Sequence, residues 1–347
     1  MPPRRRCCGR GPRGSRVWCE SVKQRGLDLI RVLADGDYHS GELIARRLGI
    51  SRTAVWKALA KAAGQFDLVV ERVPGRGYRL AVPLQLLEPE RILRALPAAA
   101  AARLGRLEVL DQIDSTNLRL MTAAAAGAPA GSVCLAERQT AGRGRRGRTW
   151  VSPFAANLYL SVLWRYPAGP AALGGVSLAA GVTVAAVLHR LGLVEVGLKW
   201  PNDLLWRGRK LGGLLLEVAG EAQGPSHLVV GLGVNLRMEV DQGRAIDQPW
   251  VDLYQALDGR PPERNVLAAA LIDALLEMLE RFGQIGLSPF LADWERYDRL
   301  RGQRVQVQLG DRVIAGEYAG IAPDGALRLD IPDGRLCLHS GEVSLRL

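Results

Sequence analysis

Two short amphipathic segments follow one another near the start of the chain, in the stretch YHSGELIARRLGISRTAVWKALAKA. The first is expected to begin near Ser40, a residue type that caps helix N-termini, and Gly49 makes the turn that follows it. Its expected inward residues are Leu43, Ile44 and Leu48. Ser51 caps the second helix, whose apolar stripe is Ala54, Val55, Ala58 and Leu59. The pattern predicts a helix-turn-helix at about residues 41–60.

The stretch LVVERVPGRGYRL comes next and has the pattern of a β-hairpin with a Pro-Gly-Arg-Gly turn. We therefore interpret residues 21–82 as a winged helix-turn-helix domain that binds DNA. The polar residues predicted to contact DNA are Ser51, Arg52, Thr53, Trp56 and Lys57. The alternative is a plain helical hairpin with solvated arginines. The net charge of +5 over residues 21–80 favours the DNA-binding interpretation.

Residues 83–295 mix helical and strand patterns. The segment NVLAAALIDALLEMLERFG predicts an amphipathic helix that stops at Gly283. Residues 166–189 carry no charge, but two prolines and four glycines leave only about 173–188 for a regular helix. That length is short for a membrane span, so we expect a buried core helix and no contact with a membrane.

Hydrophobic residues alternate with polar ones over residues 296–347, and the turns LGDR, PDGA and PDGR separate the alternating runs. This pattern predicts a small SH3-like β-barrel of about five strands.

The amino-acid composition changes at the N-terminal end of the chain, where residues 1–16 contain six arginines and no acidic residue. We expect residues 1–20 to form a disordered basic tail.

The overall net charge of +11 is concentrated near the N-terminus, because residues 81–347 contain 29 basic and 28 acidic groups. Any nucleic-acid site is therefore expected in the first 80 residues. The five cysteines have neither metal-ligand spacing nor the even count of a disulfide scaffold, and the N-terminus lacks the apolar segment of a secretory signal. We expect a cytoplasmic protein.

An arginine- and glycine-rich run, TAGRGRRGRTW, lies between two apolar segments that are predicted to be strands. Glycines allow backbone N–H groups to converge on an anion, arginines add bidentate donors, and Trp150 can stack on a flat ring. The run therefore predicts an ordered anion-binding loop, although a solvated surface loop and a nucleic-acid contact are alternatives.

Three further motifs are weak when taken alone. In KWPND, Asn202 and Asp203 offer oxygens suited to hydrated Mg²⁺ or ligand hydroxyls, but they are also ordinary turn residues. In RKLGGLLLEV, Lys210 begins an otherwise apolar strand, and Gly213 permits close approach of a ligand. GLGVN lies within a predicted strand and lacks the third glycine of a dinucleotide-binding fingerprint.

Taken in order, DSTN, RQTAGRGRRGRTW, KWPNDL, RKLGGLLLE and GVN resemble the biotin–protein ligase family. The helix-turn-helix places the resemblance with the bifunctional members of biotin operon repressor type. It implies an α+β multidomain protein with an N-terminal winged helix-turn-helix, a central mixed α/β ligase domain at 83–295 and the C-terminal barrel. Arg138 departs from the family pattern, in which an aromatic or polar residue is common.

The resemblance also implies a role for individual residues. The residues matching the biotin site are Ser115, Thr116, Asn117, Gln139, Arg143, Gly144, Arg145, Lys210 and Gly213. Those matching the ATP and adenylate site are Trp150, Arg146, Arg148, Asn202, Asp203 and Asn235. Arg143, Arg145 and Lys210 match the catalytic positions around the carboxylate and phosphate. Mg²⁺ would arrive with the nucleotide, with Asp203 as a candidate ligand.

The family joins the carboxylate of biotin to AMP from ATP and then transfers biotin to one lysine of a biotin carboxyl carrier protein. The implied partners are that acceptor, operator DNA and a second copy of the chain, in a dimer that depends on the ligand. Three alternatives remain: a lipoate–protein ligase, a ligand-sensing transcription factor without catalysis, and an RNA-binding protein. The arginine loop and the helix-turn-helix favour the biotin branch over the lipoate branch.

Overall fold

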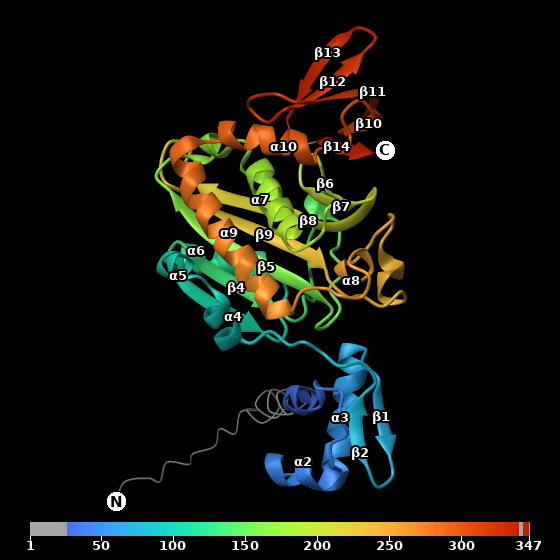
Figure 1. The fold of residues 1–347 in the computed structure, drawn as a ribbon. Coiled ribbons are helices and arrows are strands. Elements are labelled where there is room, and N and C mark those ends of the chain that lie inside the picture. The colour runs from blue at the N-terminus through green and yellow to red at the C-terminus, as the bar shows by residue number, and fades with distance from the viewer. Residues whose placement is uncertain (1–25, 340–342, 347) are drawn as a thin grey trace, which may run out of the picture. The chain divides into compact units, whose positions relative to one another are not determined.

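The computed structural model describes residues 26–339 and 343–346 and divides into two compact units, Met1–Gln85 and Leu86–Leu347 (Figure 1). The predicted tail at 1–20 lies outside the described residues. The predicted domain boundaries at 82/83 and 295/296 stay predictions; the second of them falls within helix α10 (Leu291–Tyr297).

The first unit is a helix-turn-helix followed by a hairpin. Residues 26–33 are helical, and the elements that follow are α2 (Gly41–Leu48), α3 (Arg52–Phe66) and the antiparallel strands β1 (Val70–Val73) and β2 (Gly77–Leu80). The Ser40 and Ser51 side chains accept hydrogen bonds from Glu42 N and Ala54 N, so both predicted caps form. Gly49 ends α2 with a φ of 63°, a left-handed conformation that glycine adopts readily.

The prediction that Leu43 points inward is wrong. Its exposed fraction is 60%, whereas Ile44 and Ala45 are buried. The short helix α2 packs against α3 through residues 44, 45 and 48, and this stripe leaves Leu43 on its outer flank.

A seven-stranded sheet forms the centre of the second unit. Its strands are β3 (Arg106–Leu110), β4 (Ser132–Ala136), β5 (Asn157–Tyr166), β6 (Val196–Lys199), β7 (Asp203–Trp206), β8 (Arg209–Gly220) and β9 (Ser226–Asn235). The spatial order is β3-β4-β5-β9-β8-β7-β6; only β3 and β4 pair in parallel. Strand β7 was not predicted, because its four residues directly follow the KWPN turn and are too few to show a period.

Helices cover both faces of this sheet. They are α4 (Pro89–Ala95), α5 (Ala98–Arg103), α6 (Thr116–Ala125), α7 (Val176–Arg190), α8 (Leu253–Ala256), α9 (Arg264–Ile285) and α10. Helices α7 and α9 pack on each other and, with the sheet, enclose the main core (Figure 1). Helix α6 lies across β4, β5 and β9, where Leu120 and Ala124 form a smaller apolar cluster with Leu163 and Val229.

Among the described residues, Pro170–Arg190 is the one helical segment long and apolar enough to cross a membrane by length and composition. Ten residues of α7 are buried within the protein, so this segment is the core helix expected from the sequence. Helix α9 does not stop at Gly283 as predicted but continues to Ile285. A Cβ at Gly283 would lie 3.0 Å from the Tyr166 ring, so this glycine serves close packing and does not end the helix.

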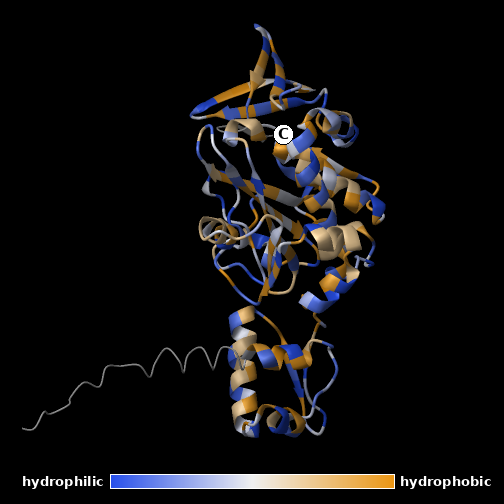
Figure 2. Ribbon diagram, turned by 90° about the vertical axis from the view of Figure 1, so that its left-hand side faces the viewer, coloured by the Kyte–Doolittle hydropathy of each residue, from blue (hydrophilic) through white to orange (hydrophobic). Residues whose placement is uncertain are grey.

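The C-terminal strands are β10 (Arg304–Leu309), β11 (Arg312–Ile321), β12 (Leu327–Ile331), β13 (Gly334–Leu338) and β14 (Val343–Arg346), in the order β13-β12-β11-β10-β14. Figure 2 shows hydrophilic and hydrophobic residues alternating along this sheet. Val307, Tyr318 and Leu329 join the main core of the second unit. No pairing between β13 and β14 occurs among the described strands, so the SH3-like barrel stays a prediction.

A fully buried ion pair ties the start of the second unit to the sheet. The Arg264 guanidinium donates to Glu137 and, at 3.1 Å, to the Asn157 carbonyl, while Glu137 Oε1 accepts from Leu87 N. The exposed fractions of Arg264 and Glu137 are 0% and 2%. One carboxylate therefore holds both the entry segment and the N-terminus of α9.

Arg264→Met is expected to destabilise the protein by about 3–5 kcal/mol, because it leaves the Glu137 carboxylate buried without its countercharge. Chemical denaturation of the ligand-free protein measures the free energy of unfolding. Arg281→Met is the matched control on the same helix. Its partner Glu277 is exposed, so the expected loss is below about 1 kcal/mol. Equal losses in the two variants would contradict the assignment.

Candidate functional site

The floor of the candidate site is the face of the sheet on which α6 lies. Side chains alternate between the two faces of a strand, and in β9 the residues on this face include Gly231 and Gly233, whereas Leu232 and Val234 point into the core. A Cβ at Gly231 would lie 2.1 Å from Asn117 Oδ1, and a Cβ at Gly233 would lie 2.5 Å from the Trp150 ring. The two glycines make room for these side chains.

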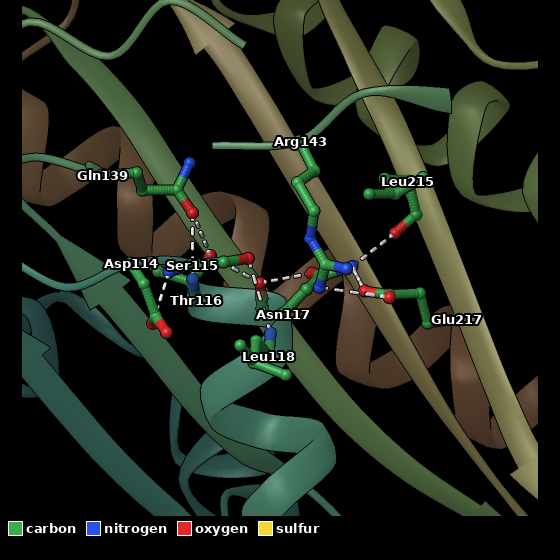
Figure 3. A network of polar contacts seen from close by, with 10 residues as sticks. Asp114, Ser115, Thr116, Asn117, Leu118, Gln139, Arg143, Leu215 and Glu217 are labelled. Atoms are coloured by element: carbon green, nitrogen blue, oxygen red, sulfur yellow. Dashed lines mark hydrogen bonds and ion pairs between the residues drawn. The ribbon is translucent and has the colours of Figure 1, made fainter. Parts of the chain in front are cut away.

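The N-terminus of α6 forms one end of the site (Figure 3). Ser115 caps the helix by accepting from Leu118 N at 3.4 Å. Gln139 Oε1 accepts from Thr116 N at 2.9 Å and lies 3.1 Å from Thr116 Oγ1. The arrangement follows from the strand-like bridge between Ile113 and Gln139, which aligns the two segments.

Asn117 occupies the centre of a buried polar network. Its amide nitrogen donates to the Leu215 carbonyl at 3.0 Å and to Glu217 Oε2 at 2.8 Å, and its Oδ1 lies 2.7 Å from the Ser161 hydroxyl. Glu217 Oε1 lies 3.3 Å from the Arg143 guanidinium. Glu217 thus contacts both α6 and the arginine loop, as Figure 3 shows.

The arginine- and glycine-rich run is an ordered loop, as predicted. Arg143 pairs with Thr149, and Gly144 N donates to the Arg148 carbonyl at 2.7 Å, which forms a small hairpin. Its tip turns at Arg146 and Gly147, which have φ values of 57° and 72°. This turn displays consecutive arginine side chains along one wall of the site.

Lysines and carboxylates form the opposite wall. Lys210 Nζ lies 2.8 Å from Asp203 Oδ1, and Lys199 Nζ lies 3.5 Å from Asp203 Oδ2. The Lys210 ammonium also lies 5.7 Å from the centre of the Trp150 ring. The Trp150 indole nitrogen is buried and has no hydrogen-bond partner among the described residues.

Arg145 reaches across the site, with its guanidinium 3.5 Å from Asn202 Oδ1. Burial lowers the pKa of the Arg145 guanidinium, and the charge of Asp203 partly offsets this effect. Arginine stays protonated in proteins, so Arg145 presents a partly desolvated positive charge to the site. Such a charge interacts with an anion more strongly than it would in water.

These walls enclose a cavity of about 340 Å³. It brings together every residue that the sequence predicted for the biotin and nucleotide sites, from Ser115 to Asn235. The segment 245–250, whose sequence gave no usable signal, also lines the cavity; Trp250 pairs with Lys210 as a strand neighbour. Sequence reasoning assigned no role to Ser161, a single polar residue in an apolar strand, or to Glu217, although Glu217 ends the RKLGGLLLE motif.

Asp203 does not fit a metal site. Both of its carboxylate oxygens face lysine ammonium groups, and the described residues contain no cluster of three histidine, cysteine, aspartate or glutamate side chains suited to a metal ion. A carboxylate held between two cations is a poor ligand for Mg²⁺. No step of the chemistry is therefore assigned to a metal held by this chain.

The residues predicted to contact DNA lie on or next to α3. Arg52, Thr53 and Lys57 are exposed. The hydroxyl of Ser51 caps the helix, and Trp56 stacks on Tyr78 at 6.0 Å and lies under Arg72 at 5.6 Å. Ser51 therefore also stabilises the start of α3, and Trp56 also holds the wing against this helix.

Three sequence profiles match this chain. The profile of the "Biotin/lipoate A/B protein ligase family" matches residues 109–235, the "Biotin protein ligase C terminal domain" matches 301–346, and an "HTH domain" matches 25–79. The first covers the segment that contains most of the cavity, and the others cover the C-terminal sheet and the first unit.

Whole proteins match over nearly the full chain. The bifunctional ligase/repressor BirA of Escherichia coli (strain K12) is 43% identical over 321 residues, which are 92% of this chain and 97% of that protein. BirA of Salmonella typhimurium is also 43% identical, over 320 residues. A solved biotin protein ligase from Aquifex aeolicus in complex with biotin and ATP has a TM-score of 0.60 at 29% identity, covering 70% of this chain and 98% of that one. The chain therefore belongs to the biotin protein ligase family, in its branch of bifunctional ligase/repressors with an N-terminal helix-turn-helix domain.

Proposed function

We propose that this protein joins biotin to AMP from ATP and then transfers biotin to one lysine of a biotin carboxyl carrier protein. The observation that carries the proposal is a single cavity with a neutral polar end at Ser115–Asn117 and a strongly basic end at the arginine loop and Lys210. A ureido ring matches the first end by hydrogen bonding, and a carboxylate next to a triphosphate matches the second by charge.

The two reaction steps need no nucleophile from the enzyme. Biotin's carboxylate attacks the α-phosphorus of ATP and pyrophosphate leaves; the acceptor lysine then attacks the mixed anhydride and AMP leaves. The barrier comes mainly from bringing two anions together, so fixed positive charges are the main requirement. Arg143, Arg145 and Lys210 line the cavity and supply such charges.

The remaining residues divide between the two substrates. Ser115, Thr116, Asn117 and Gln139 surround the polar end and would bind biotin, and Gly144 and Gly213 leave space for its chain. Trp150, Arg146, Arg148, Asn202, Asp203 and Asn235 would contact the nucleotide. Mg²⁺ would enter bound to the phosphates of ATP, since Asp203 is already held by two lysines.

Lys210→Gln is expected to slow biotinyl-AMP formation about 100-fold, because it removes one fixed countercharge of the transition state. Pyrophosphate release with biotin and ATP measures the rate. Arg209→Gln is the matched control: Arg209 is the neighbouring residue on β8, lies 5.1 Å from the Trp206 ring and does not line the cavity. Normal turnover with a large loss of ligand-free stability in Lys210→Gln would indicate a structural lysine instead.

We propose a second activity, repression by an adenylate-bound homodimer on operator DNA. One helix-turn-helix makes few contacts, so such domains usually bind as two-fold dimers on spaced half-sites. In the described structure β8 pairs with β7 through Arg209–Gly213, and Leu214 exchanges hydrogen bonds with Asn202, which leaves Leu216–Gly220 as a free edge. A free edge can pair with its own copy across a two-fold axis.

The same edge lies beside the arginine loop, because Glu217 of β8 pairs with Arg143. A ligand that orders the loop would favour the dimer by differential affinity, and DNA binding would follow. The acceptor protein would compete for this surface. In the dimer bound to its operator, the DNA would be contacted by Arg52, Thr53 and Lys57.

We place both activities in the cytoplasm. This reducing compartment is consistent with the free thiols of Cys134 and Cys337.

Val218→Lys is expected to weaken adenylate-dependent dimerisation about tenfold or more, because it puts a charge on the free edge and brings like charges together across the two-fold axis. Sedimentation with biotin and ATP measures it. Gel shifts on an inverted repeat should weaken in parallel and fall steeply with salt. Val194→Lys, which charges an exposed position outside the sheet, is the control. Equal dimerisation with and without adenylate would refute the coupling, and the ligase assignment would stand.

A further inference from the structure

Glu217 is a carboxylate on β8 to which the family resemblance assigns no role; it lies on the same strand face as Gly213 and Leu215, which line the cavity. Its side chain is 27% exposed, so solvent only partly screens it. One oxygen accepts from the Asn117 amide at 2.8 Å and the other lies 3.3 Å from the Arg143 guanidinium. The two partners come from α6 and from the arginine loop, which meet on this one side chain (Figure 3).

The orientation of Asn117 is fixed by chemistry. The Leu215 carbonyl and the Glu217 carboxylate can only accept, so they require the NH₂ end of the Asn117 amide. The amide oxygen then faces the Ser161 hydroxyl, whose proton it can accept. Asn117 and Ser161 are 4% and 0% exposed, so water cannot replace a lost partner easily.

Arg143 is in the opposite situation, because its side chain is 45% exposed. An arginine at the surface loses considerable side-chain entropy when a ligand orders it. The ion pair with Glu217 holds the guanidinium next to the cavity before any ligand arrives. Preorganisation of this kind lowers the entropic cost of binding an anion.

We propose that Glu217 is a positioning residue that aligns the two ends of the cavity: Oε2 orients Asn117 for the biotin head group, and Oε1 holds Arg143 for the acyl phosphate. The inference rests on the proposed ligase function and extends it to a residue with no expected ligand contact. Loss of the Oε2 contact should therefore weaken binding of the biotin head group, and loss of the Oε1 contact should weaken retention of the acyl phosphate.

Glutamine and alanine at this position separate the two roles. Glu217→Gln keeps one acceptor oxygen for Asn117 but turns its NH₂ group toward the Arg143 guanidinium, so only the Arg143 contact is lost. Glu217→Ala loses both contacts. Biotinol, the alcohol of biotin, is the probe for the polar end alone because it carries no anion.

Glu217→Ala is expected to weaken biotinol binding about tenfold, as for a buried donor left without its acceptor. Glu217→Gln should bind biotinol within about twofold of wild type, yet release biotinyl-AMP about fivefold faster, as expected from the loss of a partly exposed ion pair. Calorimetry measures biotinol binding, and adenylate escape is followed after removal of free ATP.

Glu108→Ala is the matched control, since Glu108 of β3 also contacts α6, through a two-bond ion pair with Arg119, but its ion pair involves neither Asn117 nor Arg143. It should change neither ligand measurement. The proposal is overturned if Gln and Ala weaken biotinol equally, or if adenylate escape from Glu217→Gln equals that of wild type. Failure of the wild-type protein to form any adenylate would instead refute the ligase function.

Discussion

The alternation of side chains across β8 and β9 is the constraint on which the rest of the structure depends. On one face, Leu214, Leu232 and Val234 close the core under α7. On the other face, Gly231 and Gly233 leave space, and Asn117 and Trp150 occupy it within distances that no Cβ would tolerate. One sheet therefore builds both a dry core and a polar cavity, and a one-residue shift in register would exchange the two faces.

A second feature of the site is that acidic side chains form ion pairs with basic side chains and orient them. Asp203 is held between Lys199 and Lys210, and Glu217 contacts Arg143. The arginine at position 145 is partly desolvated, which strengthens its attraction for an anion. A cavity of this design binds a phosphate compound through charges fixed in advance, and needs little reorganisation when negative charge develops during the reaction.

DNA binding and the ligase reaction depend on positive charge that is distributed differently along the chain. The DNA-binding unit carries an excess of +5 over residues 21–80, suited to the phosphates of a long polyanion, whereas residues 81–347 are close to neutral and concentrate their arginines at one loop. The free edge of β8 runs beside that loop. The proposed dimer would therefore be coupled to ligand occupancy through a single strand.

The sequence by itself determined the elements whose signals are local. Serine caps and glycine turns predicted the helix-turn-helix, and the family motifs named fifteen residues that all line one cavity. Each motif can be recognised because its own residues are neighbours in the chain, and the family resemblance implied that the separate motifs share one site.

Only the tertiary structure decided the contacts that depend on strand register. Glu217 meets Asn117 across 100 residues of chain, and Ser161 reaches the same side chain from β5. Gly283 is a residue type that often ends helices, but here it allows close packing against Tyr166 within α9. Leu43 is a residue type that is usually buried, but here its side chain is exposed to solvent. A local pattern reports which face of an element is apolar, but the neighbour that covers this face is chosen by packing of the whole chain.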